Sequence, residues 1–278
     1  PVHLLLWKYL GLEESMPQWA HLPLILKPDG NGKLSKRDGD RLGFPVFAMN
    51  WTDPRTGEFT QGFRERGFMP EAFVNMLALL GWNDGSGQEI FSMQDLIERF
   101  SMERVHKGGA KFDFEKAKWF NHEWIKNSTA ERLLPDVKAV LETAGIAVAD
   151  DRYLATVIDM VKERCTLMGD FAEQAAFFFR NPATHDLESI RAKWNSDKEN
   201  FFAELQGVLG DLEDWSAPAI ETAFKQLASD RGIKVGELQL PFRIMLVGGK
   251  FGPAVFEIAA AIGKTATLHR IATMPSVV

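Results

Sequence analysis

Leu26-Lys27-Pro28-Asp29-Gly30-Asn31-Gly32-Lys33-Leu34-Ser35-Lys36-Arg37-Asp38-Gly39 is the most informative stretch of the chain. Its three glycines and one proline predict a mobile loop that carries the run 33–37. Glycine lets the backbone approach a ligand closely, and lysine offers phosphate a compact positive charge. A serine hydroxyl and free backbone N–H groups can complete an anion-binding concavity. The stretch therefore predicts a lid for a triphosphate or for departing pyrophosphate.

Two other interpretations of this loop are a Walker loop and a solvated turn. It is not a Walker loop, because the spacing Gly-x-x-x-x-Gly-Lys-Ser/Thr does not occur in it. A solvated turn with ordinary surface charges fits the same residues, and the loop alone does not decide between a turn and a lid.

The run 33–37 resembles the KMSKS loop of class I aminoacyl-tRNA synthetases, in the KLSKR form of glutamyl-tRNA synthetases. Residues 21–26, His-Leu-Pro-Leu-Ile-Leu, are similar to the strand that leads into that loop. The resemblance implies that Lys36 is the main contact to the ATP phosphates and that Leu34 also contacts ATP. It further implies that Lys33, Ser35 and Arg37 order the closed lid.

The composition limits the class of protein. The 278 residues suggest about two domains, and 45% hydrophobic with 25% charged residues is ordinary for a globular protein. Apolar runs are too short for a membrane span, and the first residues lack a secretory signal. The chain has no initiator methionine, so we expect it to begin inside a longer protein. A net charge of −6 counts mildly against a nucleic-acid binder, but local basic patches stay possible.

Cysteine and histidine usage indicates an intracellular protein without a metal centre. The single cysteine, Cys165, excludes an internal disulfide and a multi-cysteine zinc site. It lies in an apolar helical stretch, which predicts a packed thiol in a reducing cytosol. The six histidines are scattered, and we expect no metal site in this chain.

The predicted fold is mainly α-helical, in three parts. Residues 1–45 contain a helix at 2–10 and a strand near 22–26, and in the resembled family this is the end of the Rossmann catalytic domain. Residues 46–147 correspond to a helical domain that contacts the tRNA stem, and residues 148–278 to a helical anticodon-binding domain. Residues 50–62 look like an insertion that forms a β-hairpin, because Asp-Pro-Arg-Thr-Gly is turn chemistry.

Helical periodicity begins at residue 70. Pro70 and Gly81 predict the start and end of a helix. Its core face is predicted to hold Phe73, Met76, Leu77 and Leu80. Ser92 and Asp95 predict a capping box.

One long helix is predicted after residue 150, with an apolar stripe formed by Leu154, Val157, Ile158, Val161, Cys165, Met168, Phe171, Ala175 and Phe178. The triplet 177–179 is interpreted as a buried helix end, with a base-stacking platform as the alternative. Three further helices are predicted at 186–194, 197–213 and 217–231.

The segment 240–258 is the second strong signal. Gly252-Pro253 predicts a helix start whose N–H groups suit an acceptor-rich ligand. The segment resembles the Pro-x-Arg…Thr-Gly…Pro-x-Leu/Val-x-Glu…Leu-Gly-Lys…Arg pattern of the anticodon-binding domain in bacterial glutamyl-tRNA synthetases. Here Val247 replaces the family's threonine, and Gly252 replaces a threonine that commonly precedes Pro253. The second change removes a hydroxyl that could contact an anticodon base.

The resemblance implies anticodon contacts at Arg164, Arg243, Gly252, Pro253 and Val255. Guanidinium suits this role because it can stack on an unpaired base and donate a planar fork of hydrogen bonds. From the spacing alone, a cap or an ion pair on its own helix is the favoured interpretation of Arg164.

Together the motifs imply a glutamate–tRNA ligase that uses ATP, as its Mg²⁺ complex, to activate glutamate and transfers it to tRNA-Glu. The HIGH motif and the glutamate-binding residues of the family do not occur in these residues, so the chain alone is predicted to be inactive. We expect a cytoplasmic monomer. A non-catalytic tRNA-binding module is the alternative, and a glutaminyl-tRNA synthetase ranks lower because that relative reads the anticodon with β-barrels.

Overall fold

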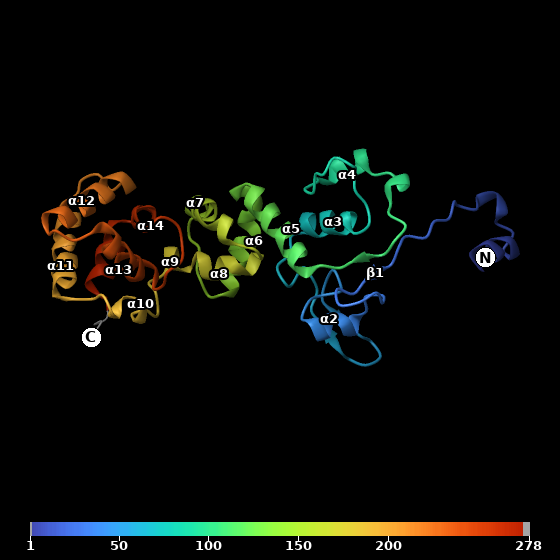
Figure 1. Cartoon of the computed structure of the whole chain (residues 1–278), viewed down its shortest axis with the longest axis horizontal. Coiled ribbons are helices and arrows are strands. Elements are labelled where there is room, and N and C mark those ends of the chain that lie inside the picture. The colour runs from blue at the N-terminus through green and yellow to red at the C-terminus, as the bar shows by residue number, and fades with distance from the viewer. Residues whose placement is uncertain (1, 275–278) are drawn as a thin grey trace. The chain divides into compact units, whose positions relative to one another are not determined.

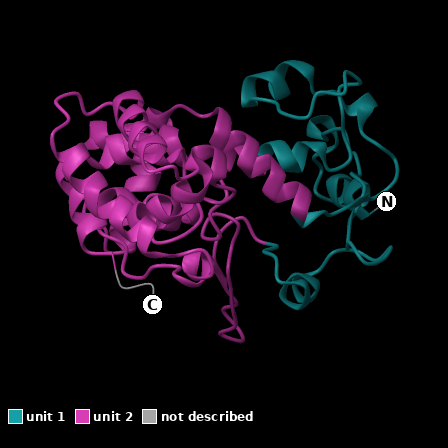
Figure 2. Cartoon of the chain, turned by 60° about the vertical axis from the view of Figure 1, so that its left-hand side comes forward, with its two compact units in different colours: residues 1–46, 74–114 teal, residues 47–73, 115–278 magenta. Residues whose placement is uncertain are grey.

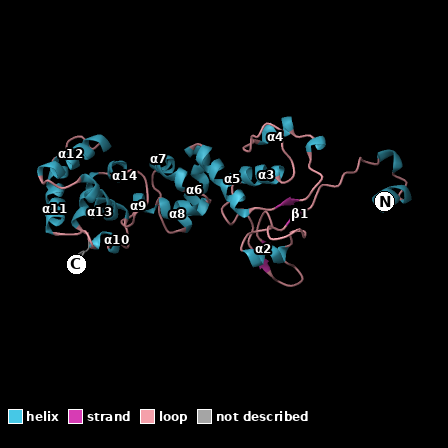
Figure 3. Ribbon diagram, in the orientation of Figure 1, coloured by secondary structure: helices cyan, strands magenta, loops and turns pink. Residues whose placement is uncertain are grey.

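The structure is a computed structural model that describes residues 2–274, and it is mainly helical, as predicted (Figures 1 and 3). The chain forms two compact units (Figure 2). Unit 1 comprises residues 1–46 and 74–114, and unit 2 comprises residues 47–73 and 115–278. The predicted boundary between residues 147 and 148 thus lies inside unit 2.

Unit 1 carries the predicted lid. Its elements are α1 (Val2–Tyr9), a 3-10 turn (Glu13–Ser15), β1 (Ile25–Leu26), α2 (Lys36–Leu42), α4 (Met93–Arg99), a 3-10 turn (Met102–Arg104) and β4 (Ala110–Lys111). Strand β1 pairs in parallel with β4, and Ile25 lies opposite Ala110. The helix predicted at 2–10 and the strand near 22–26 are therefore present, although the strand is only two residues long.

Helix α3 (Pro70–Leu79) begins in unit 2 and continues into unit 1. It starts at Pro70, as predicted, and Gly81 ends the turn behind it with a φ of +102°. Met76 is buried, but Leu77 is 42% exposed, so the prediction of Leu77 as a core residue is wrong. Apolar periodicity locates a face of a helix, but it does not tell how far the neighbouring elements extend over that face.

The capping box of α4 is confirmed. The N–H of Asp95 donates to Ser92 Oγ over 3.0 Å, and the N–H of Ser92 donates to Asp95 Oδ2 over 2.9 Å. These two bonds satisfy donors that the first turn of a helix leaves without intrahelical partners.

Unit 2 begins with the predicted hairpin, in which β2 (Trp51–Thr52) pairs antiparallel with β3 (Phe59–Thr60). Its first helices are α5 (Phe114–Asn127), α6 (Ala130–Thr143), α7 (Asp151–Val161), α8 (Phe171–Gln174) and α9 (Ala176–Phe179). The later helices are α10 (Glu188–Arg191), α11 (Ser196–Gly210), α12 (Ala217–Asp230), α13 (Val235–Val247), α14 (Val255–Ile262) and α15 (Lys264–Ala272). The three predicted helices at 186–194, 197–213 and 217–231 correspond to α10, α11 and α12.

The long helix predicted after residue 150 is wrong as one continuous element. Helix α7 ends at Val161, and two 3-10 turns (Lys162–Arg164 and Met168–Asp170) precede α8 and α9. All nine residues of the predicted stripe are nevertheless buried. The carboxylate of Asp170 accepts from the N–H groups of Thr166 and Leu167, over 2.7 and 2.9 Å, and so binds donors that a continuous helix would use itself.

The triplet 177–179 is a buried helix end, and the alternative of a base-stacking platform is wrong. Phe177 and Phe178 are 3% and 5% exposed, because both rings belong to the core of unit 2. That core continues through packed rings of the later helices, where the ring centroid of Phe224 lies 5.3 Å from the ring centroids of both Phe242 and Phe256.

Helix α14 begins at Val255, with Ala254 at its N-cap position. The prediction that Gly252-Pro253 opens this helix is therefore wrong by two residues. Gly252 has a φ of +95°, a conformation that favours glycine, and a side chain there would also meet the ring of Phe177. Within residues 2–274, no helix is long and apolar enough to cross a membrane.

Candidate functional site

Backbone hydrogen bonds hold together the segment that was predicted to be a mobile loop. The N–H of Lys27 donates to the carbonyl of Gly32 over 3.0 Å, and the N–H of Leu34 donates to the carbonyl of Ile25 over 2.8 Å. Leu26 and Lys33 form an isolated antiparallel bridge. Residues 27–32 are therefore a tight turn that returns the chain to the end of β1.

Lys36 and Arg37 occupy the first turn of α2, so their predicted position on a loop is wrong. Asp38 explains why the helix starts here. Its Oδ2 accepts from the N–H and the hydroxyl of Ser35, over 3.1 and 2.6 Å. The carboxylate at the third helical position thereby satisfies a donor at the N-cap, as in a capping box.

Carboxylates neutralise part of the positive charge around α2. Arg41 pairs with Asp29 at 2.6 Å and with Asp38 at 3.5 Å, and Lys27 lies 3.9 Å from Asp38. The hydrogen bond from Ser35 is the main cause that lowers the pKa of Asp38, and the bond from Arg41 is the main cause that lowers the pKa of Asp29.

Two cations of the predicted lid stay uncompensated. Lys33 and Arg37 are exposed, and neither forms an ion pair within residues 2–274. They are therefore available to an anion, whereas Lys27 and Arg41 hold the fold of the turn.

Arg164 lies in the turn directly after α7 and is exposed. In the part of the chain that the structure describes, its side chain forms neither a hydrogen bond nor an ion pair. The alternative that Arg164 caps its own helix or pairs on it is therefore wrong. The neighbouring thiol of Cys165 is buried, which confirms the predicted packed cysteine, and burial raises its pKa to about 12.

Arg243 is half-buried, and its guanidinium binds backbone. Nη1 donates to the carbonyls of Phe251, Gly252 and Pro253, over 3.0, 3.1 and 2.6 Å. These bonds fix the segment before α14 and explain why the helix does not start at Gly252. Burial, followed by the nearby charge of Arg164, lowers the pKa of Arg243. The structure thus brings together two arginines, 79 positions apart, neither of which has an acidic partner in residues 2–274.

A pocket of about 760 Å³ adjoins Arg164, and Pro253, Ala254 and Glu257 are among its lining residues. The other predicted anticodon residues are placed differently. Gly252 packs against the ring of Phe177, and the side chain of Val255 is 4% exposed in the core. The prediction of Val255 as a contact therefore fails for its side chain, because the first turn of α14 buries it in the hydrophobic core of unit 2.

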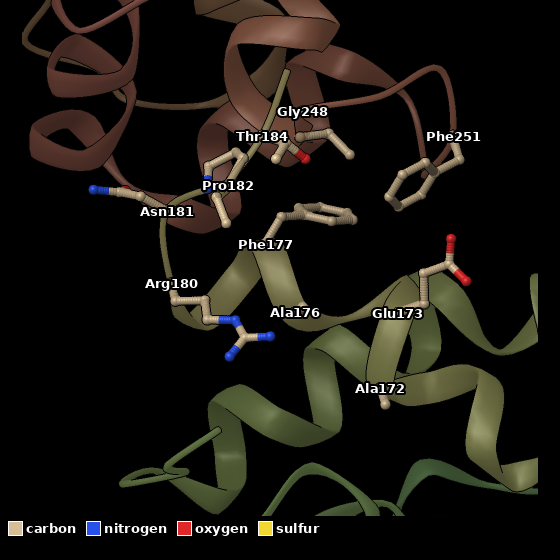
Figure 4. Close-up of a pocket in the computed structure, with 12 residues that line it drawn as sticks. Ala172, Glu173, Ala176, Phe177, Arg180, Asn181, Pro182, Thr184, Gly248 and Phe251 are labelled. Carbon is tan, nitrogen blue, oxygen red and sulfur yellow. The ribbon is translucent and has the colours of Figure 1, made fainter. Parts of the chain in front are cut away.

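Sequence reasoning missed a second, smaller pocket of about 280 Å³ in unit 2 (Figure 4). Figure 4 shows the rings of Phe177 and Phe251 beside each other, with Glu173 and Arg180 on nearby segments. No local motif predicts this pocket, because its walls come from α8, α9, residues 180–184 and the end of α13 with the residues that follow it.

Arg270 fixes the wall of this smaller pocket, and its role was also missed. Its guanidinium donates to the carbonyls of Leu246, Phe177 and Arg180 and to Asn181 Oδ1. The side chain is buried at 4% exposure. It is the last arginine of the pattern noted in the sequence, but the pattern did not reveal what the side chain binds. Within residues 2–274, no group of His, Cys, Asp and Glu side chains could hold a metal ion.

Comparison with known proteins identifies the family. Residues 1–119 match the family model described as "tRNA synthetases class I (E and Q), catalytic domain", and residues 119–274 match the model described as "Anticodon binding domain". The chain belongs to the class I tRNA synthetases of the glutamate and glutamine type. The resemblance inferred from the motifs is thus confirmed.

The similar proteins are named glutamate–tRNA ligase. That of Phocaeicola vulgatus is 45% identical over 98% of this chain and 54% of its own length, and that of Porphyromonas gingivalis (strain W83) is 44% identical over the same shares. The crystal structure of a glutamate tRNA ligase from Elizabethkingia meningosepticum, in complex with its amino acid, superposes with a TM-score of 0.88. It is 40% identical and covers 98% of this chain and 53% of that one. The chain spans about half the length of the curated relatives that it matches.

Proposed function

We propose that this chain forms the phosphate-side lid and the tRNA-binding part of a glutamate–tRNA ligase. The complete reaction would join ATP and glutamate into glutamyl-adenylate and then transfer glutamate to the terminal adenosine of tRNA-Glu. The relatives carry this name, and the matched models cover residues 1–274. Within this proposal, residues 1–45 end the catalytic domain, residues 46–147 contact the tRNA stem, and residues 148–278 bind the anticodon. We place the enzyme in the cytoplasm as a monomer.

In this proposal the lid acts by differential binding. The ammonium group of Lys36 contacts the β,γ-phosphates of magnesium-bound ATP, and its effect grows as negative charge develops on the departing pyrophosphate. Lys33 and Arg37 add charge that no carboxylate neutralises, which supports a role toward the same anion. Leu34 and Ser35 hold the turn, because the N–H of each is bound inside the fold.

One observation carries the proposal for the tRNA side: Arg164 and Arg243 are neighbours without acidic partners in the described chain. Arg243 Nη1 donates hydrogen bonds to three carbonyls and so fixes the segment 251–253. Arg164 keeps its whole guanidinium for a ligand. A planar cation beside a pocket suits the acceptor edge of an unpaired base, and we assign it to the third anticodon base of tRNA-Glu.

The test is binding of this chain to tRNA-Glu and tRNA-Gln at one fixed salt concentration. We expect Arg164→Gln to reduce the preference for tRNA-Glu by roughly 1–3 kcal/mol, because a bidentate base contact is lost. Arg152→Gln is the matched control, since Arg152 is also exposed and lies at the other end of α7. An equal loss on both tRNAs would show that Arg164 serves only phosphate or the fold.

The alternative function is a tRNA-binding module without catalysis. Uncompensated cations on the lid argue against it, because a pure binder has no use for a pyrophosphate lid. Residues 1–278 alone should bind tRNA and form no adenylate, since only the lid side of the ATP site is recognisable in them. Glutamate-dependent ATP–pyrophosphate exchange by this purified chain would overturn that assignment.

A further inference from the structure

Asn121, in the middle of α5, is fully buried and uses both ends of its amide. Oδ1 accepts from the N–H of Met69 over 2.7 Å. Nδ2 donates to the carbonyl of Thr166 over 2.6 Å and to the carbonyl of Gly67 over 3.2 Å. The partners fix the orientation of the amide, because a backbone N–H can only donate and a carbonyl can only accept. Asn121 thus joins two segments that are about a hundred positions apart.

His122, the next residue, holds the same turn. Its Nδ1 lies 2.9 Å from the carbonyl of Cys165, so Nδ1 carries the proton and donates. On the other side, the N–H of Met168 donates to the carbonyl of Gly67 over 2.9 Å. Gly67 has a φ of +96°, and a Cβ at this position would lie 3.0 Å from Met168 N. Residues 165–168 are therefore clamped between α5 and the backbone at Gly67.

This clamp begins one residue after Arg164. Because α7 stops at Val161, the carbonyls that follow lack intrahelical donors, and buried carbonyls need partners. Side chains of α5 supply these donors from inside the molecule. The backbone of the turn is fixed internally while the guanidinium of Arg164 stays outside and unpaired.

We propose that Asn121 and His122 are positioning residues for anticodon discrimination, which set the turn from which Arg164 reaches the third anticodon base. The inference rests on the proposed function of Arg164. A fork of hydrogen bonds to a base edge depends on the orientation of the guanidinium, whereas contacts to phosphate tolerate a looser side chain. Loosening the turn therefore lowers discrimination more than overall affinity.

The experiment compares binding to tRNA-Glu with binding to a tRNA-Glu transcript that is changed only at the third anticodon base. Asn121→Asp keeps the shape of the side chain but removes both N–H donors and places a carboxylate against two carbonyls. We expect the ratio of the two affinities to fall about tenfold or more, toward the ratio of Arg164→Gln. In the double variant with Arg164→Gln, Asn121→Asp should cause no further fall, because one variant acts through the other.

Two controls separate positioning from general damage. Asn127→Asp changes an exposed asparagine on the same helix, whose Nδ2 bonds only locally to the carbonyl of Glu123 over 2.8 Å, and should leave the ratio unchanged. His122→Phe removes the donor to Cys165 and should lower the ratio. His122→Asn should restore it, because Asn Nδ2 can stand in the place of His Nδ1. This pair also decides the matter if Asn121→Asp does not fold.

The outcomes are distinct. A wild-type chain that binds both transcripts equally, or an Arg164→Gln variant that keeps the ratio, would overturn the proposed function and this inference with it. If Arg164→Gln lowers the ratio while Asn121→Asp and His122→Phe weaken both transcripts equally, only the positioning role is wrong. A further fall in the Arg164→Gln background would likewise show that Asn121 acts elsewhere.

Discussion

Positive side chains have different partners in two regions of the molecule: the turn around α2, and the region of Arg243 and Arg270 in unit 2, here called the arginine region. Around α2, Arg41 and Lys27 pair with carboxylates at the surface. In unit 2, Arg243 and Arg270 are partly or fully buried, and they bind backbone carbonyls and one amide oxygen. A carboxylate cancels the charge that it holds, whereas a set of carbonyls holds a cation and leaves its charge in place.

A site for an anionic ligand can use a buried cation that carbonyls hold in place or an exposed cation that can move. A buried cation without a counter-ion is costly, so it persists only where several acceptors converge on it. Such a site is rigid and keeps its net charge. An exposed cation costs little and can move toward its ligand, which suits a lid that must close and open. We therefore expect loss of a cation near α2 to affect catalysis more than stability, and loss of a buried arginine in unit 2 to affect stability.

Lys36→Ala should give the largest effect on catalysis. In the full-length ligase we expect adenylate formation to slow by roughly 2–4 kcal/mol, as for loss of one preorganised transition-state contact, with a smaller change in glutamate affinity. The rate of ATP–pyrophosphate exchange reports on adenylate formation. Lys225→Ala, which alters an exposed lysine of α12 paired with Glu221, is the control. An unchanged rate in the Lys36 variant would exclude the phosphate role.

Arg270→Met should give the largest effect on stability. It leaves three carbonyls and the Asn181 oxygen without their donor, and we expect the free energy of unfolding of unit 2 to fall by about 3 kcal/mol. Arg41→Met removes an exposed arginine with two carboxylate partners and should change stability little. Hydrogen exchange, measured in each unit at increasing urea concentration, gives the free energy of unfolding of both variants. Equal losses would contradict the proposed contrast between buried and surface cations.

Gly39→Ala tests what anchors α2. A Cβ at this position would lie 2.3 Å from Val46 Cγ2 and 2.8 Å from the carbonyl of Phe44. Although alanine favours helices, the clash should destabilise unit 1 by about 1–3 kcal/mol, as other overpacked sites do. Gly207→Ala, within α11 and with open space around its Cβ position, is the matched control and should be neutral or stabilising. Amide exchange in 36–42 should accelerate only in the Gly39 variant.

Acid should loosen the lid region before the arginine region. Folding lowers the pKa of Asp38 below its ordinary value of 3.8, mainly through the hydrogen bond from Ser35. The ionised carboxylate therefore stabilises the fold above pH 3.8, and this contribution is lost as the pH falls through the lowered pKa. Arginine–carbonyl contacts do not titrate there. We expect amide protection in 38–42 to fall between pH 4 and the pKa of Asp38 while protection in α13 persists.

Ser35→Ala sharpens the acid test. Without the hydroxyl donor, the pKa of Asp38 in the folded chain should return toward 3.8, so less protection in 38–42 should be lost as the pH falls below 4. Identical pH profiles for the variant and the wild-type chain would mean that Asp38 does not hold α2.

Local sequence determined most of the elements. Pro70 set the start of α3, Ser92 and Asp95 capped α4, and turn residues between short β-prone runs made the hairpin at 51–60. The stripe from Leu154 to Phe178 specified burial correctly even where the helix is broken. The residue types of the run 33–37 predict a lid, while Arg164 and Arg243 are proposed as anticodon contacts only through the resemblance. Periodicity and caps act within a few residues, so they can be read without the fold.

Tertiary structure decided where helices stop and what the arginines bind. The break after Val161 depends on donors from Asn121 and His122, about forty positions away, and on the carboxylate of Asp170. The start of α14 depends on Arg243, and the wall of the smaller pocket on Arg270. In each case a side chain from outside the helix satisfies backbone groups that the helix would otherwise satisfy itself. No local pattern contains that competition, because its outcome depends on which buried donors and acceptors the fold brings within hydrogen-bonding distance.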